Sequence, residues 1–134
     1  MGRKHILVVD DEADMRVGLS RLLSRAGYRV ELARDGTEVL PKLNRQGWYD
    51  AIVLDLMMPG QDGYKTMRDL SENGYGDVPV VLVTAKFSPT DVALGHDYGA
   101  AVFIRKPFSP SGLISAIEYA MQKATRPKAG LWLD

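Results

Sequence analysis

The sequence predicts an α/β fold in which one parallel β-sheet is covered by helices on both faces. Five short apolar runs alternate along the chain with five segments whose apolar residues recur at helical spacing. Four of these runs are almost continuously apolar, which is typical of strands buried on both faces of a parallel sheet. The second run alternates apolar and polar residues, which favours a half-exposed strand at a sheet edge. With 134 residues, the chain is long enough for one domain with a full hydrophobic core.

The first strand, the first helix and the edge strand follow one another at the start of the chain. His5–Val9 contains β-branched residues and ends at a run of three acidic residues. From residue 15 to 26, apolar side chains recur at helical spacing, and Gly27 supplies a stop signal. The alternating run then occupies residues 28–32, which we expect to be the edge strand.

The second helix has a clear beginning but an unusual interior. Residues 35–38, Asp-Gly-Thr-Glu, resemble a capping box that opens the helix, and Gly47 closes it. Pro41 lies inside this segment, where it removes a backbone donor. We therefore expect Pro41 to kink or shorten the helix.

Each of the last three strands runs into polar residues and then into a helix. The strands are expected at Ala51–Leu54, Val80–Val83 and Ala101–Ile104. After the first of them, a loop at 55–63 precedes a helix marked by apolar residues between 64 and 70. Ser88-Pro89 and Ser109-Pro110 each combine an N-cap residue with a proline at the first helical position, so the last two helices should begin there.

Composition excludes several classes of function. Seventeen basic residues balance seventeen acidic ones, so no overall charge attracts nucleic acid or an anionic membrane, and no local basic patch is evident. The absence of cysteine excludes disulfides, thiolate catalysis and zinc–thiolate sites. No apolar run approaches the roughly 20 residues that a membrane span needs. We therefore expect a soluble, cytoplasmic protein that binds neither nucleic acid nor membrane directly.

The most informative residues stand at the carboxyl ends of the strands. They are Asp10, Asp11, Asp55, Thr84 and Lys106. In open parallel sheets, binding sites form beyond these strand ends, where the strand order reverses. The edge strand contributes no comparable residue. We expect the five side chains to converge at one rim of the sheet.

Three carboxylates at such a rim repel one another, so either some are protonated or a cation neutralises them. Because the candidate ligands are hard oxygens without histidine or cysteine nearby, we expect Mg²⁺, with Mn²⁺ or Ca²⁺ as alternatives, rather than zinc. Lys106 adds a mobile positive charge and Thr84 a hydroxyl donor, and both suit a phosphoryl group. Asp55 is the best candidate nucleophile, because its strand lies between the acid pair and the other two side chains.

Four ordered motifs resemble those of the receiver domains of two-component response regulators. They are Ile6–Glu12, Ile52–Gly63, Val81–Ala85 and Gly99–Phe108. The similarity covers about residues 4–123, and residues 124–134 are expected to be a tail or the start of a linker. The resemblance implies a flavodoxin-like, CheY-like three-layer sandwich with five helices and a five-stranded parallel sheet in the order 2-1-3-4-5.

The resemblance also implies a metal site and a phosphorylation site. Asp55 would be the phosphorylated residue. Asp11 would bind Mg²⁺ directly and Asp10 would bind it through water. Asp55 and the backbone carbonyl of Met57 would be further ligands.

The remaining motif residues would contact the phosphoryl group or respond to it. Thr84 would hydrogen-bond the phosphoryl group, Lys106 would contact it as a counter-ion, and the Lys106-Pro107 peptide bond would be cis. The family switches through a strand-4 hydroxyl and a strand-5 aromatic, here Thr84 and Phe103. Because Phe103 lacks the hydroxyl of a tyrosine, the switch would have to work by packing. The output surface would be the fourth helix, the fifth strand and the fifth helix.

Two positions in this family influence how readily water attacks the acyl phosphate. They lie two residues after Asp55 and two after Thr84, where this chain has Met57 and Lys86. Both side chains are long enough to shield the phosphate, so we expect a fairly long-lived phosphorylated state.

The resemblance implies partners as well. The phosphoryl donor would be a phosphohistidine on a sensor histidine kinase or on a histidine phosphotransfer protein. No DNA-binding or enzymatic output domain fits in the chain, so it would serve an unknown output protein or an appended effector domain. It would be a monomer or a phosphorylation-dependent homodimer. We expect self-directed phosphoryl acceptance and slow autodephosphorylation, not enzymatic turnover.

Other functions remain open from the residues alone, since one fold hosts many functions. A Mg²⁺-dependent, aspartate-based phosphohydrolase usually needs a second acid where Met57 stands. A flavin binder needs a phosphate-cradling loop where acidic residues 10–12 would repel the phosphate. A phosphorylation-independent protein-binding scaffold would not need the complete acid set. The acid pair could also simply favour the start of a helix, and Phe103 could be an ordinary core residue.

Overall fold

The structure, a computed structural model, describes residues 2–58, 62–85 and 88–125. Five parallel strands form one sheet in the order β2-β1-β3-β4-β5. The strands are β1 (His5–Val9), β2 (Arg29–Ala33), β3 (Ala51–Asp55), β4 (Val80–Thr84) and β5 (Val102–Arg105). The helices are α1 (Ala13–Arg25), α2 (Val39–Gln46), α3 (Gly63–Glu72), α4 (Pro89–Asp97) and α5 (Pro110–Thr125). The predicted fold class and strand order are confirmed.

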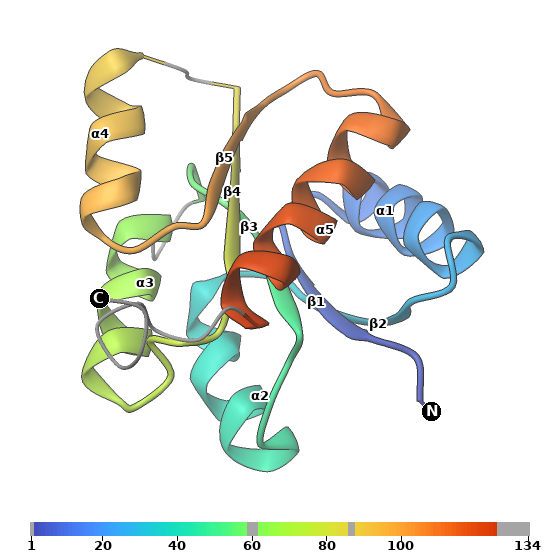
Figure 1. Cartoon of the computed structure of the whole chain (residues 1–134), viewed down its shortest axis with the longest axis horizontal. Coiled ribbons are helices and arrows are strands. Elements are labelled where there is room, and N and C mark those ends of the chain that lie inside the picture. The colour runs from blue at the N-terminus through green and yellow to red at the C-terminus, as the bar shows by residue number, and fades with distance from the viewer. Residues whose placement is uncertain (1, 59–61, 86–87, 126–134) are drawn as a thin grey trace.

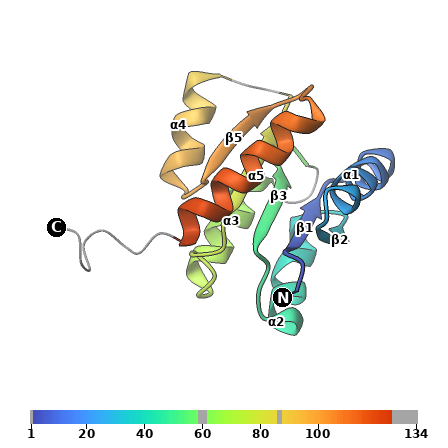
Figure 2. The same ribbon diagram turned by 45° about the vertical axis from the view of Figure 1, so that its right-hand side comes forward.

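Alternating side chains of the strands build a separate core on each face of the sheet. On one face, Leu7 and Leu54 belong to a buried cluster with residues of α2 and α3. On the other face, Val8 and Val53 belong to a second cluster with residues of α1 and α5. This alternation follows from the two-residue period of a strand, and it explains why the central strands read as continuous apolar runs. Figures 1 and 2 show the sheet between these two helical layers.

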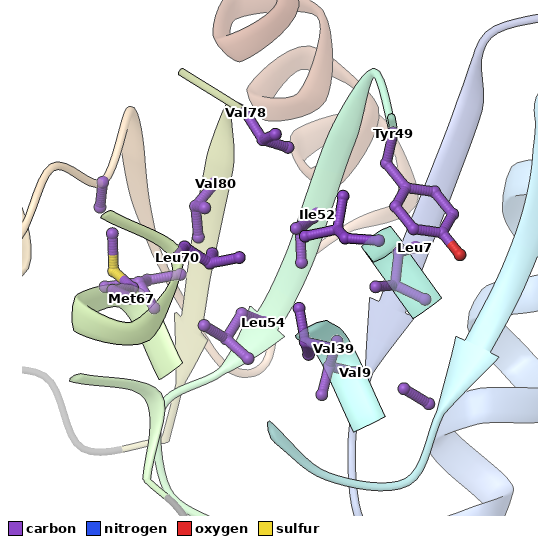
Figure 3. Packing of buried hydrophobic residues seen from close by; sticks show 14 of the residues in the cluster. Leu7, Val9, Val39, Tyr49, Ile52, Leu54, Met67, Leu70, Val78 and Val80 are labelled. Atoms are coloured by element: carbon purple, nitrogen blue, oxygen red, sulfur yellow. The ribbon is translucent and has the colours of Figure 1, made fainter. Parts of the chain in front are cut away.

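The buried cluster beneath α2 and α3 spans three neighbouring strands of the sheet. Figure 3 shows Leu7, Ile52 and Val80 of three neighbouring strands facing the same helical layer, with Met67 of α3 and Val39 of α2 among them. All five side chains are less than a tenth exposed. A rigid core of this kind fixes the positions at which the strands end.

The observed boundaries differ from the sequence predictions by about one residue. β3 and β4 each include the polar residue expected just beyond them, Asp55 and Thr84. β5 begins at Val102 instead of residue 101, and β2 covers 29–33 instead of 28–32. Helix and strand ends are the least determined part of a sequence pattern.

The second helix begins later than the capping pattern suggested. Asp35 caps a short 3₁₀ turn at Gly36–Glu38, its carboxylate accepting a hydrogen bond of 2.8 Å from the N–H of Thr37. The α-helix itself starts at Val39, so Pro41 lies in its first turn. A proline there removes no helical hydrogen bond, because the first N–H groups of a helix have no partner inside it. The expected shortening therefore takes the form of a delayed start.

The predicted start of α4 is confirmed. The hydroxyl of Ser88 accepts a hydrogen bond of 3.1 Å from the N–H of Asp91, and Pro89 occupies the first turn. These contacts fix where the helix begins after β4. Among the described residues, none of the helices is long and apolar enough to span a lipid bilayer.

Candidate functional site

An acidic cluster lies at the carboxyl ends of β1 and β3. Val9 is in register with Leu54, so the next residue on each strand brings Asp10 beside Asp55. One carboxylate oxygen from each of Asp10, Asp11 and Asp55 lies within 4.8 Å of the other two. Asp10 and Asp55 are buried and Asp11 is exposed. The sheet thus brings together the three acids that the sequence predicted to meet.

Lys106 reaches this cluster from the β5 edge of the sheet. It directly follows β5, two strands away from β3, and its N–H donates a hydrogen bond of 2.8 Å to the carbonyl of Thr84. Its Nζ lies 3.2 Å from Oδ2 of Asp10 and 3.2 Å from Oδ2 of Asp55. The Lys106-Pro107 peptide bond is cis. One ammonium group therefore bridges two buried carboxylates.

Burial and neighbouring charge act in opposite directions on these groups. Burial raises the pKa of Asp55 and the nearby Asp10 adds to this, while the Met57 N–H and the Lys106 ammonium lower it; burial prevails, so the pKa lies above its usual value. Burial alone would lower the pKa of Lys106, but the carboxylates of Asp55 and Asp10 outweigh it and raise the pKa. The lysine therefore stays charged. The raised pKa of Asp55 thus reflects mainly its burial, and a cation bound beside it would favour the charged carboxylate.

Met57 and Thr84 lie next to Asp55 along the chain and on the neighbouring strand. Its Oδ1 accepts a hydrogen bond of 3.1 Å from the N–H of Met57, whose side chain is 52% exposed. Asp55 is in register with Val83, so Thr84, which is fully buried, lies one residue further along β4. Lys86 lies outside the described residues.

Phe103, the expected switch aromatic, lies on β5 and is partly buried against the core beneath α4. Its ring packs against Gly95 of α4. A Cβ on Gly95 would approach ring atoms of Phe103 to 2.8 and 3.0 Å and Leu82 to 3.1 Å. The glycine thus leaves the space that the aromatic ring occupies.

Arg16 of α1 is a residue of this region that the sequence analysis missed. Its Nη1 donates a hydrogen bond of 2.7 Å to the backbone carbonyl of Asp10. A signal was present, because an arginine in the early turns of a helix is disfavoured by the helix dipole and so suggests another reason for its position. No spacing rule, however, links it to the carbonyl that it contacts.

The donor set fits a hard divalent cation. Three carboxylates converge, Asp11 is exposed to an arriving ion, and the cluster contains no nitrogen or sulfur ligand. Mg²⁺ and Ca²⁺ prefer such oxygen ligands, and Mg²⁺ typically keeps several waters beside one or two carboxylates.

Comparisons with known proteins show the family to which the chain belongs. The family model of the response regulator receiver domain matches residues 6–118. Response regulator MprA from Mycobacterium sp. (strain KMS) is 42% identical over 127 residues, which cover 93% of this chain and 53% of that protein. Response regulator MprA from Mycobacterium leprae is 42% identical over 122 residues, covering 91% and 52%. The chain spans about half the length of these curated relatives.

Solved structures show the same fold. The chemotaxis protein CheY4 of Vibrio cholerae superposes with a TM-score of 0.82 at 31% identity, covering 89% of this chain and 99% of that one. The receiver domain of a signal transduction histidine kinase from Syntrophus aciditrophicus gives a TM-score of 0.81 at 31% identity, covering 94% and 96%. The family match, the relatives and the strand order agree, and the chain belongs to the response regulator receiver domains of two-component signal transduction.

Proposed function

We propose that this chain is a phospho-accepting switch that takes a phosphoryl group from a phosphohistidine onto Asp55 in a Mg²⁺-dependent reaction. Receiver domains bind Mg²⁺ at an acidic pocket and work with a sensor kinase and an output effector. The observation that carries the proposal is the position of Asp55, buried within an acidic cluster and contacted by the ammonium of Lys106. The donor would be a sensor histidine kinase or a histidine phosphotransfer protein.

The acid cluster would hold the cation. Asp11, Asp55 and the backbone carbonyl of Met57 would be direct ligands, with Asp10 acting through water. Asp11 suits direct binding because it is exposed and makes no hydrogen bond or ion pair with any other described residue. When bound, the cation would offset negative charge on the oxygens of the transferring phosphoryl group.

Transfer would use an oxygen of the Asp55 carboxylate as the nucleophile. A bond forms between that oxygen and phosphorus while the bond from phosphorus to the histidine nitrogen breaks, and its electron pair stays with the imidazole. Lys106 already lies 3.2 Å from Asp55, so its charge is in place to stabilise the transferred group. Thr84 would donate its hydroxyl to a phosphoryl oxygen.

The signal would leave through α4, β5 and α5. Phe103 on β5 packs against Gly95 of α4, so a movement of the Phe103 ring would reach α4. Exposed apolar side chains are those of Leu94 on α4, Tyr98 directly after α4, and Tyr119 on α5. Because Phe103 lacks a hydroxyl, we propose that its movement is coupled to α4 by packing alone.

The same proposal covers the extent and the partners of the chain. Residues 4–123 would form the receiver unit, and residues 124–134 a tail or the start of a linker. The output partner would be a separate protein or an appended effector domain, and phosphorylation would act on a monomer or drive homodimerisation. The chemistry would be limited to phosphoryl acceptance and slow autodephosphorylation.

Met57 sets an expectation for the lifetime of the phosphorylated state. Its exposed side chain lies two residues after Asp55 and would hinder an attacking water. The aspartyl phosphate of the wild type should decay more slowly than that of Met57→Asn. A dephosphorylation time course measures this, and equal or faster decay of the wild type would contradict the expectation.

Phosphorylation by a small-molecule donor tests the function directly. With Mg²⁺ and acetyl phosphate, intact mass spectrometry should show one added phosphoryl group. Asp55→Asn or removal of the metal should abolish it, whereas Asp14→Asn, an exposed acid in the first turn of α1, should be labelled like the wild type. An unmodified wild type, or equal labelling of Asp55→Asn, would refute the proposal.

A further inference from the structure

Arg16 contacts the candidate cation site through the backbone and not through a carboxylate. The residue lies in the second turn of α1, and its side chain points back toward the start of the helix, as helical side chains do. There its Nη1 donates a hydrogen bond of 2.7 Å to the carbonyl oxygen of Asp10. Within the described part of the chain, no carboxylate forms an ion pair with Arg16. Its interaction with the site is therefore directed at one peptide group.

The contact completes the hydrogen bonding of Asp10. The N–H of Asp10 donates to the carbonyl of Ala33 at 3.2 Å. Its Oδ1 accepts from the N–H of Glu12 at 2.9 Å, and its Oδ2 accepts from Lys106 at 3.2 Å. With Arg16 on the carbonyl, each polar atom of this buried residue has a hydrogen-bond partner. A buried carbonyl that lost its partner would be costly, so the contact should persist.

The Asp10 carbonyl belongs to the peptide group that leads into Asp11. Fixing that oxygen fixes the plane of the peptide, and this plane together with φ of Asp11 sets the direction in which the Asp11 side chain leaves the backbone. Asp11 is exposed and, among the described residues, makes no hydrogen bond or ion pair of its own. Its orientation therefore depends on the backbone that carries it.

We propose that Arg16 is a positioning residue for the cation site, which holds the Asp10–Asp11 peptide so that Asp11 faces the ion. This rests on the proposed function only in assuming that the acid cluster binds Mg²⁺. Partners that orient metal ligands commonly change metal affinity by about 10–100-fold when they are removed. The charge of Arg16 acts in the opposite sense, since a nearby guanidinium repels a cation. If Arg16 positions Asp11, removing it should weaken Mg²⁺ binding; if its charge mattered most, removing it should strengthen Mg²⁺ binding.

Titration calorimetry with MgCl₂ separates these roles. Arg16→Met should bind Mg²⁺ about 10-fold more weakly than the wild type, at both low and high ionic strength. Arg21→Met removes the same charge from an exposed position on the same helix and should stay within about twofold of the wild type, as expected for a screened surface charge. Arg16→Lys keeps the charge and one flexible donor, and its affinity should lie between those of Arg16→Met and the wild type.

A second readout excludes a general loss of structure. Circular dichroism and the melting temperature without metal establish that each variant is folded before the titration. If Arg16→Met does not fold, Arg16→Gln, which is polar but shorter, should show the same loss of Mg²⁺ affinity. At saturating Mg²⁺, the rate of labelling by acetyl phosphate should return close to the wild-type rate, because the lesion lies in metal binding.

The outcomes are distinguishable from a failure of the proposed function. A Mg²⁺ affinity of folded Arg16→Met or Arg16→Gln that is unchanged or increased would overturn the inference, even if the wild type is labelled on Asp55. A wild type that binds Mg²⁺ but is never labelled would overturn the proposed function and leave the inference standing if the Arg16 variants bind more weakly. A wild type that binds no Mg²⁺ would overturn both.

Discussion

The two edges of the sheet are held in different ways. At the β2 edge, Glu31 faces three basic groups: Lys42 Nζ at 3.4 Å, Arg45 Nη2 at 3.7 Å and His5 Nε2 at 3.6 Å. Lys42 and Arg45 lie on α2, so these contacts tie that helix to the edge strand. The edge is further secured by the buried residues of α1 and α2.

At the β5 edge, the corresponding helix is lightly held. In the described part of α4, Gly95 alone is buried, and the side chains of β5 are all at least partly exposed. The helix is tied to α3 by Tyr64, whose hydroxyl donates toward Asp91 at 3.2 Å to its carbonyl and 3.3 Å to its carboxylate. The ring of Tyr64 also lies 5.3 Å from that of Tyr98.

The weaker packing is at the β5 edge, which is the edge through which the proposed switch signal would have to pass. Segments that move in regulation come from the least stable parts of a fold, which have few buried apolar contacts. The β2 edge carries no residue of the proposed switch, whereas the β5 edge carries Phe103. We expect α4 to respond to local changes that α1 and α2 would absorb.

Two glycines inside helices give the strongest test of this contrast. Alanine at Gly18 of α1 meets no atom within 4 Å and should raise the free energy of unfolding by about 1 kcal/mol through helix propensity. Alanine at Gly95 of α4 would overlap the Phe103 ring and should lower it by about 1–2 kcal/mol. Urea unfolding measures both.

A double variant shows whether the overlap is the cause. In a Phe103→Leu background, Gly95→Ala should cost less than in the wild type, because the ring atoms nearest to the new methyl group are gone. Stabilisation of the wild type by Gly95→Ala would contradict the proposed fit between Phe103 and α4.

Replacement of Glu31 tests whether its ion pairs hold the β2 edge. Glu31→Gln should lower the free energy of unfolding by about 1 kcal/mol, since it leaves the mostly buried Lys42 without its carboxylate. The loss should shrink at high salt. Lys65→Gln, which breaks an exposed pair with Asp69 on α3, should cost only about 0.3 kcal/mol. Equal costs would mean that the β2 network adds nothing beyond an ordinary surface pair.

The tether between α3 and α4 should have a smaller and local effect. Burial, with the nearby Asp91 carboxylate, raises the pKa of Tyr64 to about 12, so its hydroxyl remains a donor at neutral pH. Tyr64→Phe keeps the ring contact and removes the hydrogen bonds, at a cost of about 0.5–1 kcal/mol. Hydrogen exchange should quicken in α4 and not in α1.

Tyr75→Phe is the matched control, because the Tyr75 hydroxyl donates to Asn44 of α2 at 2.7 Å. Its loss should leave exchange in α4 unchanged. If both variants speed exchange in α4 equally, Tyr64 has no special role there.

The smallest expected effect is a pH dependence at the β2 edge. Burial and the Arg29 charge lower the pKa of His5, and Glu31 and Asp50 only partly oppose this. The unfolded chain therefore binds a proton at His5 more readily than the folded chain does. The contribution of neutral His5 to the free energy of unfolding is complete above the ordinary pKa of 6.5, and it is lost as the pH falls from that value toward the lower pKa of the folded state. Urea denaturation of His5→Gln from about pH 7.5 down to about pH 5 should show a free energy of unfolding that depends less on pH than that of the wild type. An unchanged dependence would assign the effect to other groups.

Much of the fold followed from local pattern. The alternation of residues 28–32 identified the edge strand, and Ser88-Pro89 marked the start of α4, because both signals depend only on neighbouring residues. The meeting of Asp10 with Asp55 followed from the rule that parallel strands end at the same rim.

Other features could not be predicted because they depend on where separate elements come to lie. The delayed start of α2 resulted from a 3₁₀ turn that absorbed the capping residues before Pro41. The contact of Arg16 with a carbonyl and the reach of Tyr64 to Asp91 join residues whose spacing carries no periodic signal. The fit of the Phe103 ring against Gly95 likewise appears only once β5 and α4 are packed together.

The connections of this chain fall into two sets with different tolerances. Among the residues that the structure describes, the glycines with positive φ are Gly27, Gly47, Gly74 and Gly99; each follows a helix and leads back toward the amino end of a strand. The acids and Lys106 lie at the opposite rim, Asp55 as the last residue of β3 and the others directly after β1 and β5. Circular permutation or insertion of a reporter at the glycine turns should therefore leave the acidic rim intact. Lengthening the connection between β1 and α1, which carries Asp10 and Asp11, should move these carboxylates away from Asp55. Insertions should therefore be tolerated best at the rim that carries no site residue.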